Sequence, residues 1–150
     1  ALGLSIDTMS KTPSGAVLLK DLAEAQLGPF ACDHPERLVI GGSPEIRVAP
    51  ATAQSLGLVF HELGTNAAKY GAWAKAEGRV ELEWRETDEG LTIIWRECDG
   101  PAVVQPSRTG FGSSLIEMMI ERNIRGTVQR DYRETGLVVT LNLPERPLTV

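Results

Sequence analysis

The sequence predicts an α/β protein, a two-layer sandwich in which helices cover one face of a mixed sheet. Three observations lead to this fold class. Apolar residues recur at helical spacing over residues 50–70, apolar and charged residues alternate over 79–86 and 91–97, and a second alternating pair, 126–132 and 136–143, follows. Helical spacing indicates one buried helix face and alternation indicates half-buried strands. Elements of these two kinds pack in layers around one core.

The first half of the chain predicts two helices and two short strands. A helix over about 16–27 follows a Pro-Ser-Gly break and ends at a Gly-Pro pair. Residues 37–40 and 45–48 are typical of short strands, and two glycines, a serine and a proline form the turn between them. Pro50 opens the long helix. Its buried face is expected to carry Leu56, Val59, Phe60, Leu63 and Ala67.

The second half predicts four strands and one helix. An acidic turn that ends in Gly90 joins the strands over 79–86 and 91–97, and a loop with prolines and glycines follows them. A helix is expected over about 113–123, and the last two strands form a hairpin. Trp84 and Trp95 lie on strands and are expected in the core.

Composition excludes several classes of protein. The 150 residues carry a net charge of −5 and are 42% hydrophobic, which suits a real core and argues against a duplex nucleic-acid binder with its basic face. No apolar run is long enough for a membrane span. Two distant cysteines, Cys32 and Cys98, have no metal spacing and favour a reducing, cytoplasmic compartment. Because the sequence begins with Ala1 rather than Met, we expect it to be part of a longer protein.

The long helix contains the stretch FHELGTNAAKYG, in which Gly64 and Asn66 are poor interior helix residues. Glu62 and Asn66 are four residues apart and Lys69 follows three later, so the three side chains share one helix face. This face is either an ordinary solvated surface or a metal and phosphate site. In a site, Asn66 would offer an oxygen to Mg²⁺, Lys69 would pair with phosphate, and Glu62 would orient or deprotonate a nucleophile.

Two further stretches favour the phosphate site. WRECDGP (95–101) ends a strand with two acids and a glycine, and a strand-end carboxylate can accept the exocyclic amine of adenine. GFGSSLI (110–116) places two glycines before a helix, whose free N–H groups attract phosphate. Each glycine signal alone is weak, and the order of the three stretches is the stronger signal.

With these stretches in this order, the chain resembles the ATP-binding catalytic domain of sensor histidine kinases, which has the Bergerat fold shared with gyrase. More narrowly, it resembles the HWE kinases, named for a His in the Asn box and a Trp-x-Glu in the first glycine box. FHELGTNAAKYG supplies His61, and WRE supplies Trp95 and Glu97. GFGSSLI matches the second glycine box, and the resemblance covers roughly residues 35–143.

The resemblance implies roles for residues of the Asn box. Asn66 matches the Mg²⁺-binding Asn, and Glu62 matches the acid that acts near the transferred phosphate. His61 is either a half-buried structural histidine or a member of the catalytic site. Lys69 matches the Lys that contacts phosphate, and Tyr70 is expected to line the nucleotide.

The glycine boxes imply the remaining nucleotide contacts. Glu97 matches the acid at the end of the adenine-side strand, and Gly100 follows in the adenine turn. Asp99 stands where the family usually has Gly, so either acid could hold adenine. Residues 101–109 match the lid. Arg108, on the lid, is a candidate phosphate clamp by its charge and position alone. The other implied contacts are Gly110, Phe111, Gly112 and Leu115 in the second glycine box.

Two further departures from the family concern packing and the last strand. Gly64 stands where Ala is usual, which is expected to loosen the helix beside the site. Leu137 stands where many histidine kinases have Thr, which puts an adenine contact there in doubt.

The implied activity is transfer of the ATP γ-phosphoryl group to a histidine, with ATP and Mg²⁺ as cofactors. Because neither His34 nor His61 lies in a segment resembling an acceptor, the acceptor is expected on upstream dimerisation helices of the same protein. Residues 1–30 would lead from those helices, and 31–150 would form the catalytic domain. The phosphoryl group would then pass to the receiver domain of a response regulator. Neither nucleic-acid nor membrane contact is expected from this segment.

Three alternatives to the histidine kinase stay open, and the simplest is a plain α/β domain in which the motifs are coincidental. The second is a non-catalytic interaction or phosphotransfer module that keeps the fold. The third is a different ATPase or a serine kinase on the same fold, against which the Trp-x-Glu and His61 features weigh.

Overall fold

The computed structural model describes residues 15–101 and 115–147. Its main sheet has five strands in the order β2-β4-β5-β7-β6, with β2 parallel to β4 and the other neighbours antiparallel. A second, two-stranded antiparallel sheet joins β1 to β3. The strands are β1 (Val17–Leu18), β2 (Leu38–Ile40), β3 (Arg47–Val48), β4 (Arg79–Thr87), β5 (Gly90–Cys98), β6 (Thr127–Arg133) and β7 (Gly136–Leu143).

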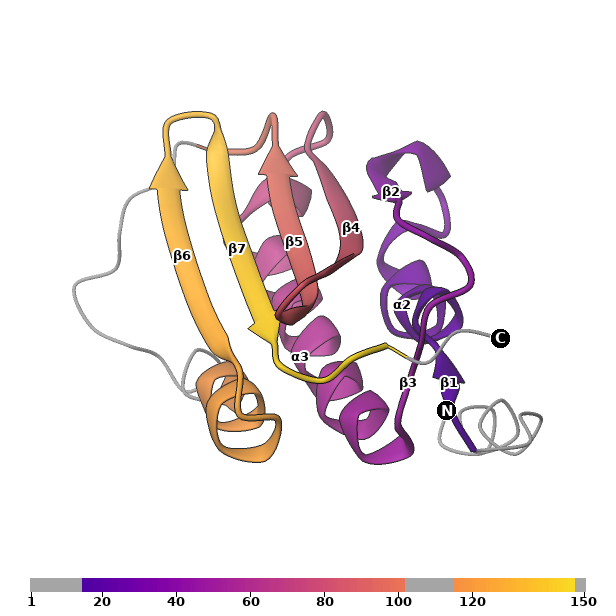
Figure 1. Ribbon diagram of the computed structural model, residues 1–150. Helices are drawn as coiled ribbons and strands as arrows, with labels where there is room; N and C mark the ends of the chain where they lie inside the picture. The colour runs from indigo at the N-terminus through magenta and orange to yellow at the C-terminus, as the bar shows by residue number, and fades with distance from the viewer. Residues whose placement is uncertain (1–14, 102–114, 148–150) are drawn as a thin grey trace.

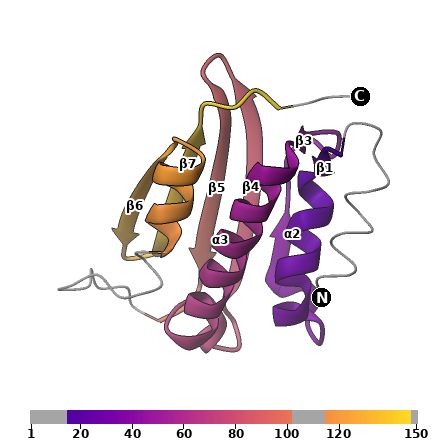
Figure 2. The ribbon, with the colours of Figure 1, turned by 90° about the horizontal axis from the view of Figure 1, so that it is seen from below.

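Helices α2 (Leu19–Leu27) and α3 (Pro50–Lys69) form the second layer. Both lie on the same face of the main sheet, and so does the helix that ends in the π-helical turn η4 (Met118–Asn123) (Figures 1 and 2). This arrangement confirms the predicted two-layer sandwich with a mixed sheet. The 3₁₀ turns are η1 (Gly28–Ala31), η2 (Pro35–Arg37) and η3 (Ala72–Ala74).

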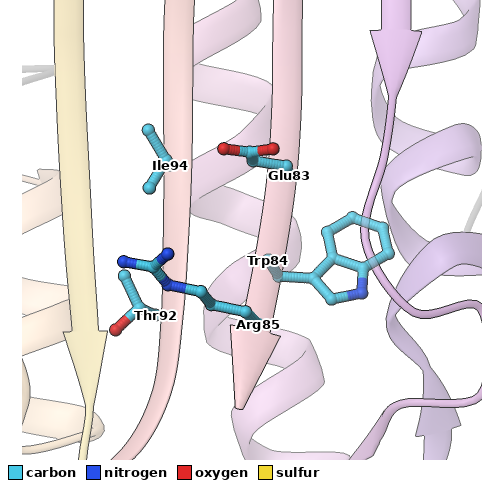
Figure 3. Close-up of a pocket in the computed structure, with 5 residues that line it drawn as sticks. All are labelled: Glu83, Trp84, Arg85, Thr92 and Ile94. Atoms are coloured by element: carbon cyan, nitrogen blue, oxygen red, sulfur yellow. The ribbon is translucent and has the colours of Figure 1, made fainter. Parts of the chain in front are cut away.

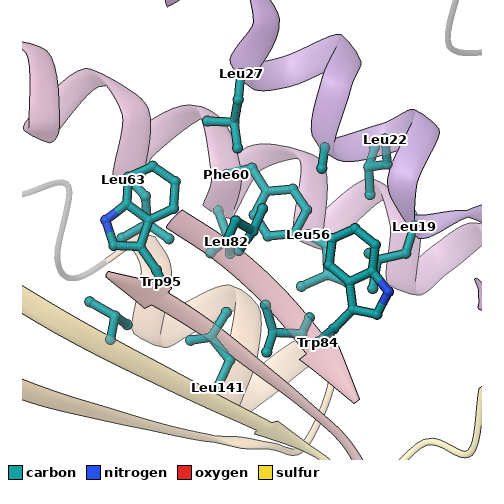
Figure 4. Close-up of a cluster of buried hydrophobic side chains, with 14 of the residues drawn as sticks. Leu19, Leu22, Leu27, Leu56, Phe60, Leu63, Leu82, Trp84, Trp95 and Leu141 are labelled. Carbon is teal, nitrogen blue, oxygen red and sulfur yellow. The ribbon is translucent and has the colours of Figure 1, made fainter. Parts of the chain in front are cut away.

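The core lies between the sheet and these helices. Alternate residues of β4 are buried, and Trp84 and Trp95 are almost fully covered, as predicted. Burying one Leu, Ile or Phe side chain contributes roughly 1.5–3 kcal/mol before entropy is counted, which can hold α3 in place despite its poor helix formers. Figure 4 labels the central side chains of this cluster: Leu19, Leu22, Leu27, Leu56, Phe60, Leu63, Leu82, Trp84, Trp95 and Leu141.

Gly64 has a packing role in α3. A Cβ at this position would lie 2.6 Å from the ring of Phe30, so glycine lets that ring approach the helix backbone. Glycine costs about 1 kcal/mol relative to alanine inside a helix, and the contact with Phe30 explains why it is present. α3 continues unbroken through Gly64 to Lys69, and the expected loosening of the helix beside the site stays a prediction.

The two short strands of the first half form as predicted, but they join different sheets. β2 lies beside β4 in the main sheet, whereas β3 pairs with β1, with Val17 opposite Val48. The chain leaves the main sheet at Gly42, whose φ is +98° and whose Cβ would lie 2.7 Å from the carbonyl oxygen of Trp84. Glycine adopts this conformation readily, and a side chain would collide there.

Two predicted helix boundaries differ from the structure. α2 begins at Leu19 rather than near residue 16, because Val17 and Leu18 pair with β3. The predicted start of the helix over 113–123 lies outside the described residues, and the described part is helical from Leu115.

α2 packs in the same core as the sheet and α3. The described part of segment 1–30 therefore adds to the packing of the rest of the chain, and the role of that segment as a lead from upstream helices stays a prediction. Among the described helices, none is long and apolar enough to cross a membrane.

Candidate functional site

The candidate site lies on the last two turns of α3. Because the helix is continuous to Lys69, its residues Glu62, Asn66 and Lys69 share one side, away from the buried Leu63 and Ala67. Glu62 and Asn66 are half-buried, and Lys69 is exposed. Within the described part of the chain, none of these three side chains forms a hydrogen bond or an ion pair. Their oxygen and nitrogen atoms are therefore available to a ligand.

Helix α3 ends at the edge of the main sheet where β5 stops (Figure 1). The backbone oxygen of Asn66 accepts hydrogen bonds from the N–H groups of Tyr70 at 2.8 Å and Gly71 at 3.2 Å. The chain then turns through η3 towards the end of β5. Tyr70 is 76% exposed, so its ring has no place in the core and is free to line a ligand.

Glu97, the predicted adenine-side acid, is a buried residue with 6% of its surface exposed. Its Oε1 accepts the N–H of Ala72 and its Oε2 accepts the Nε1–H of Trp95, each at 3.0 Å. Burial raises the pKa of the Glu97 carboxyl group, and these two hydrogen bonds oppose the rise. Trp95 and Glu97 are two apart on β5 and so face the same side of the sheet. The two residues of the Trp-x-Glu pair are therefore hydrogen-bonded to each other, and Glu97 also bonds the turn after α3 at Ala72.

A row of aromatic rings links His61 to this contact. Trp73 meets Trp95 edge to face with ring centroids 6.0 Å apart, and it stacks on Phe30 at 5.4 Å. Phe30 in turn lies 5.9 Å from the imidazole of His61. His61 is exposed, which differs from the expectation of a half-buried histidine. The row joins α3, η1, η3 and β5, so the His and the Trp-x-Glu pair pack in one region.

Asp99 has a different environment from Glu97. It is exposed, its φ is +59°, and its Oδ2 lies 2.5 Å from Nη1 of Arg79. Aspartate enters this left-handed region more often than most residues, which explains how it can stand where the family usually has Gly. Its other carboxylate oxygen has no bond within the described part of the chain.

Gly100 brings the end of β5 into backbone contact with η3. A Cβ on Gly100 would lie 2.5 Å from the Cα of Ala72, and a Cβ on Gly71 would overlap Oε1 of Glu97. The two segments can lie this close only because both positions lack a side chain. The predicted adenine turn and the end of the Asn-box helix are thus in direct contact.

Known proteins resemble this chain in sequence. No family model matches the chain. It is 37% identical over 139 residues, 91% of its length, to blue-light-activated histidine kinase 1 of Erythrobacter litoralis. It is 33% identical over 130 residues, 85% of its length, to a blue-light-activated histidine kinase of Rhizobium johnstonii. The chain spans 38% and 36% of the lengths of these two proteins.

A solved structure agrees in fold. The catalytic domain of histidine kinase ThkA matches with a TM-score of 0.69 at 18% identity, over 89% of this chain and 97% of that one. The chain is homologous to histidine kinases and has the fold of their catalytic domain. The resemblance predicted from the Asn box and the two glycine boxes is thereby confirmed at the level of the histidine kinase family.

The phosphate-side half of the histidine kinase site stays a prediction. Arg108, Gly110, Phe111 and Gly112 lie outside the described residues, so the structure places none of them. Leu115 is half-buried in the helix that leads into η4. The structure brings together the Asn-box helix, the Trp-x-Glu pair and the predicted adenine turn.

Sequence reasoning missed the residues that hold η3 in place. Arg37 donates from Nε to the backbone oxygen of Gly78 at 2.9 Å, and the backbone oxygen of Arg37 accepts the Nε1–H of Trp73 at 2.9 Å. A second nitrogen of Arg37 donates to the backbone oxygen of Lys75. The available signal was the segment GAWAKAEG, in which a single large aromatic residue, Trp73, lies between two glycines.

A hollow of about 90 Å³ lies elsewhere in the described part of the chain. It is lined by residues of β4 and β5, and no predicted site residue takes part (Figure 3). Its volume is well below the roughly 300–1,000 Å³ of small-molecule sites. The lining residues are Glu83, Trp84, Arg85, Thr92 and Ile94.

Proposed function

We propose that the chain is the ATP-binding catalytic domain of an HWE-type sensor histidine kinase in a two-component system. The observation that carries the proposal is the row of Glu62, Asn66 and Lys69, whose side chains have no partner among the described residues, in a chain homologous to histidine kinases. The reaction breaks the bond from the γ-phosphorus to the bridging oxygen and forms a bond to an imidazole nitrogen, and ADP leaves. A cytoplasmic location belongs to the same proposal, because ATP is the phosphoryl donor.

The residues of α3 fit Mg-ATP. Asn66 would offer bound Mg²⁺ a neutral side-chain oxygen, the type of ligand that this ion prefers. Bound Mg²⁺ would offset the charge of the phosphates. Lys69, one turn further and exposed, reaches phosphate oxygens as a cation. Glu62, one turn earlier, accepts a proton from the attacking imidazole or orients it. The contribution of the protein is positioning and charge stabilisation, as in other phosphoryl transfers.

The adenine end of the site favours Asp99 over Glu97 as acceptor of the exocyclic amine. Both oxygens of Glu97 already accept hydrogen bonds and the group is buried, whereas Asp99 is exposed with one oxygen unpaired in the described part of the chain. Tyr70, exposed at the end of α3, would line the nucleotide from the other side.

The acceptor histidine lies outside these 150 residues in this proposal. His34 and His61 are the two histidines of the sequence. His34 lies in an exposed loop before η2, and His61 lies on α3 beside the proposed catalytic acid. The acceptor would belong to dimerisation helices of the same protein, and a receiver domain of a response regulator would take the phosphoryl group next.

The test is calorimetric titration of the chain with a non-hydrolysable ATP analogue, with and without Mg²⁺. We expect Mg²⁺ to tighten binding at least about tenfold, equivalent to 1.4 kcal/mol, and Asn66→Ala to abolish that gain. Gln54→Ala, an exposed change on the same helix, is the matched control and should keep the gain. Absence of binding at millimolar nucleotide would contradict the proposal and favour a module that keeps the fold for protein contacts.

A further inference from the structure

Arg37, the last residue of η2, makes three hydrogen bonds to the loop of residues 71–78, which connects α3 to β4. Its Nε donates to the backbone oxygen of Gly78 at 2.9 Å, and a second guanidinium nitrogen donates to that of Lys75. Its own backbone oxygen accepts the indole N–H of Trp73 at 2.9 Å. One residue from an earlier part of the chain therefore holds this loop at three points.

The end of the loop packs on its beginning. The N–H of Gly78 donates to the backbone oxygen of Lys75 at 3.2 Å, and the N–H of Lys75 donates to that of Ala72 at 3.4 Å. A Cβ on Gly78 would overlap the backbone oxygen of Ala72, so the two backbones touch. The carbonyl groups that the guanidinium of Arg37 bonds thus belong to the part of the loop that packs on Ala72.

The beginning of the loop is continuous with the proposed metal and phosphate residues. The backbone oxygen of Asn66 accepts the N–H groups of Tyr70 and Gly71 at 2.8 and 3.2 Å. The backbone oxygen of Gly71 in turn accepts the N–H of Ala74 at 2.9 Å. Backbone hydrogen bonds therefore run without a break from the turn of α3 that carries Asn66 and Lys69 into the loop that Arg37 holds.

The sequence of the loop, GAWAKAEG, consists largely of Gly and Ala, whose small side chains provide few contacts of their own. Glycine also has the widest choice of backbone conformations. The loop therefore depends on contacts from outside it. A guanidinium suits this role, because its planar fork of N–H donors can bond two carbonyl groups at once.

We propose that Arg37 is a positioning residue for the nucleotide site, which fixes the loop of residues 71–78 and, through it, the last turn of α3. This turn then presents Asn66, Lys69 and Tyr70 in place before the ligand arrives. Such preorganisation strengthens binding, because less ordering is left to the binding step. The effect on nucleotide binding rests on the function proposed above, whereas the hold on the loop is a property of the fold.

Three variants separate positioning from a general contribution to stability. Arg37→Met keeps an unbranched side chain and removes every side-chain donor. Arg37→Lys keeps the positive charge but lacks the fork that spans two carbonyl groups. Glu145→Ala is the matched control, since it removes a hydrogen bond to the N–H of Ala49 at the other end of α3. Circular dichroism checks that each variant is folded.

Two measurements are made on each folded variant, well below its unfolding temperature. The first is hydrogen exchange at the amides of Gly71 and Gly78 without nucleotide, and the second is calorimetric affinity for a non-hydrolysable ATP analogue with Mg²⁺. We expect Arg37→Met to speed exchange at both amides at least about tenfold and to weaken binding about tenfold. Arg37→Lys should recover part of both losses. Glu145→Ala should match the wild type in both, because its lost contact lies away from the loop.

Three results would overturn the proposal. Unchanged exchange at Gly71 in Arg37→Met would show that the arginine does not fix the end of α3. Faster exchange with unchanged affinity would show that the hold on the loop does not reach the site. An equal loss of affinity in Glu145→Ala would show that only general stability matters. Exchange at Gly71 needs no nucleotide, so it decides the hold on the turn even if the wild type binds none, an outcome that would count against the proposed function.

Discussion

Glu145 caps helix α3 from a position 96 residues further along the chain than Ala49. Its Oε2 accepts the backbone N–H of Ala49 at 3.0 Å, and its other oxygen accepts the hydroxyl of Thr52. The helix lacks a side-chain cap of its own, since Ala49 stands at the N-cap and Pro50 follows. A carboxylate here accepts one free N–H at the helix start and interacts favourably with the helix dipole.

Replacing Glu145 with alanine should destabilise the protein by about 1 kcal/mol, the usual cost of losing a helix cap. Equilibrium unfolding in urea would measure the loss as a lower midpoint with an unchanged slope. Glu134→Ala, an exposed residue in the turn between β6 and β7, is the control and should leave the midpoint in place. Equal midpoints for the two variants would show that the cap contributes nothing.

Gly100→Ala should cost about 1–3 kcal/mol of stability, because its new methyl group would press on the backbone of Ala72 in a tightly packed region. Gly41→Ala is the matched control. A Cβ on Gly41 meets its nearest atom at 3.7 Å, an ordinary contact, and its φ lies outside the left-handed region. Thermal unfolding of both variants tests the contrast, and a Gly100→Ala protein as stable as Gly41→Ala would contradict the close contact of β5 with η3.

Asp99→Ala should be less stable than Asp99→Gly by about 1–2 kcal/mol, since a Cβ is unfavourable in the left-handed region and glycine is not. Both variants lose the same exposed ion pair with Arg79, so that loss cancels in the comparison. Urea unfolding of the two proteins side by side gives the difference. Equal stabilities would mean that residue 99 takes an ordinary backbone conformation in solution.

The buried Glu97 carboxyl group should make stability depend on pH. Its pKa in the folded protein is raised by burial above the value of about 4.3 expected in an unfolded chain. The folded state then binds the proton more tightly, so this group stabilises the fold fully below about pH 4.3 and the contribution is lost as pH rises through the folded pKa.

The pH dependence is measured against Glu97→Gln, which cannot titrate. We expect the unfolding free energy of the wild type, minus that of the variant, to fall as pH rises from about 4.3 through the raised pKa. Urea unfolding at a series of pH values provides both curves. A difference that stays constant with pH would show that Glu97 keeps an ordinary pKa.

Much of the fold could be predicted because apolar residues recur at helical or strand spacing along the sequence. The alternation of Val80, Leu82 and Trp84 with charged residues marks β4, and helical spacing marks α3; both lie where predicted. The candidate site was predictable only in part. The shared face of Glu62, Asn66 and Lys69 follows from spacing, but the burial of Glu97 does not, because it depends on which segment packs above β5.

By itself the sequence determined the type and order of the main elements and the polar face of α3, because helical and strand periods act between near neighbours. The tertiary structure alone decided that β2 and β3 join different sheets, that Glu145 caps α3, and that Glu97 holds Ala72. These contacts join residues far apart in the chain, and no local period specifies which distant donor will meet a given acceptor. Burial and backbone packing make that choice when the layers assemble.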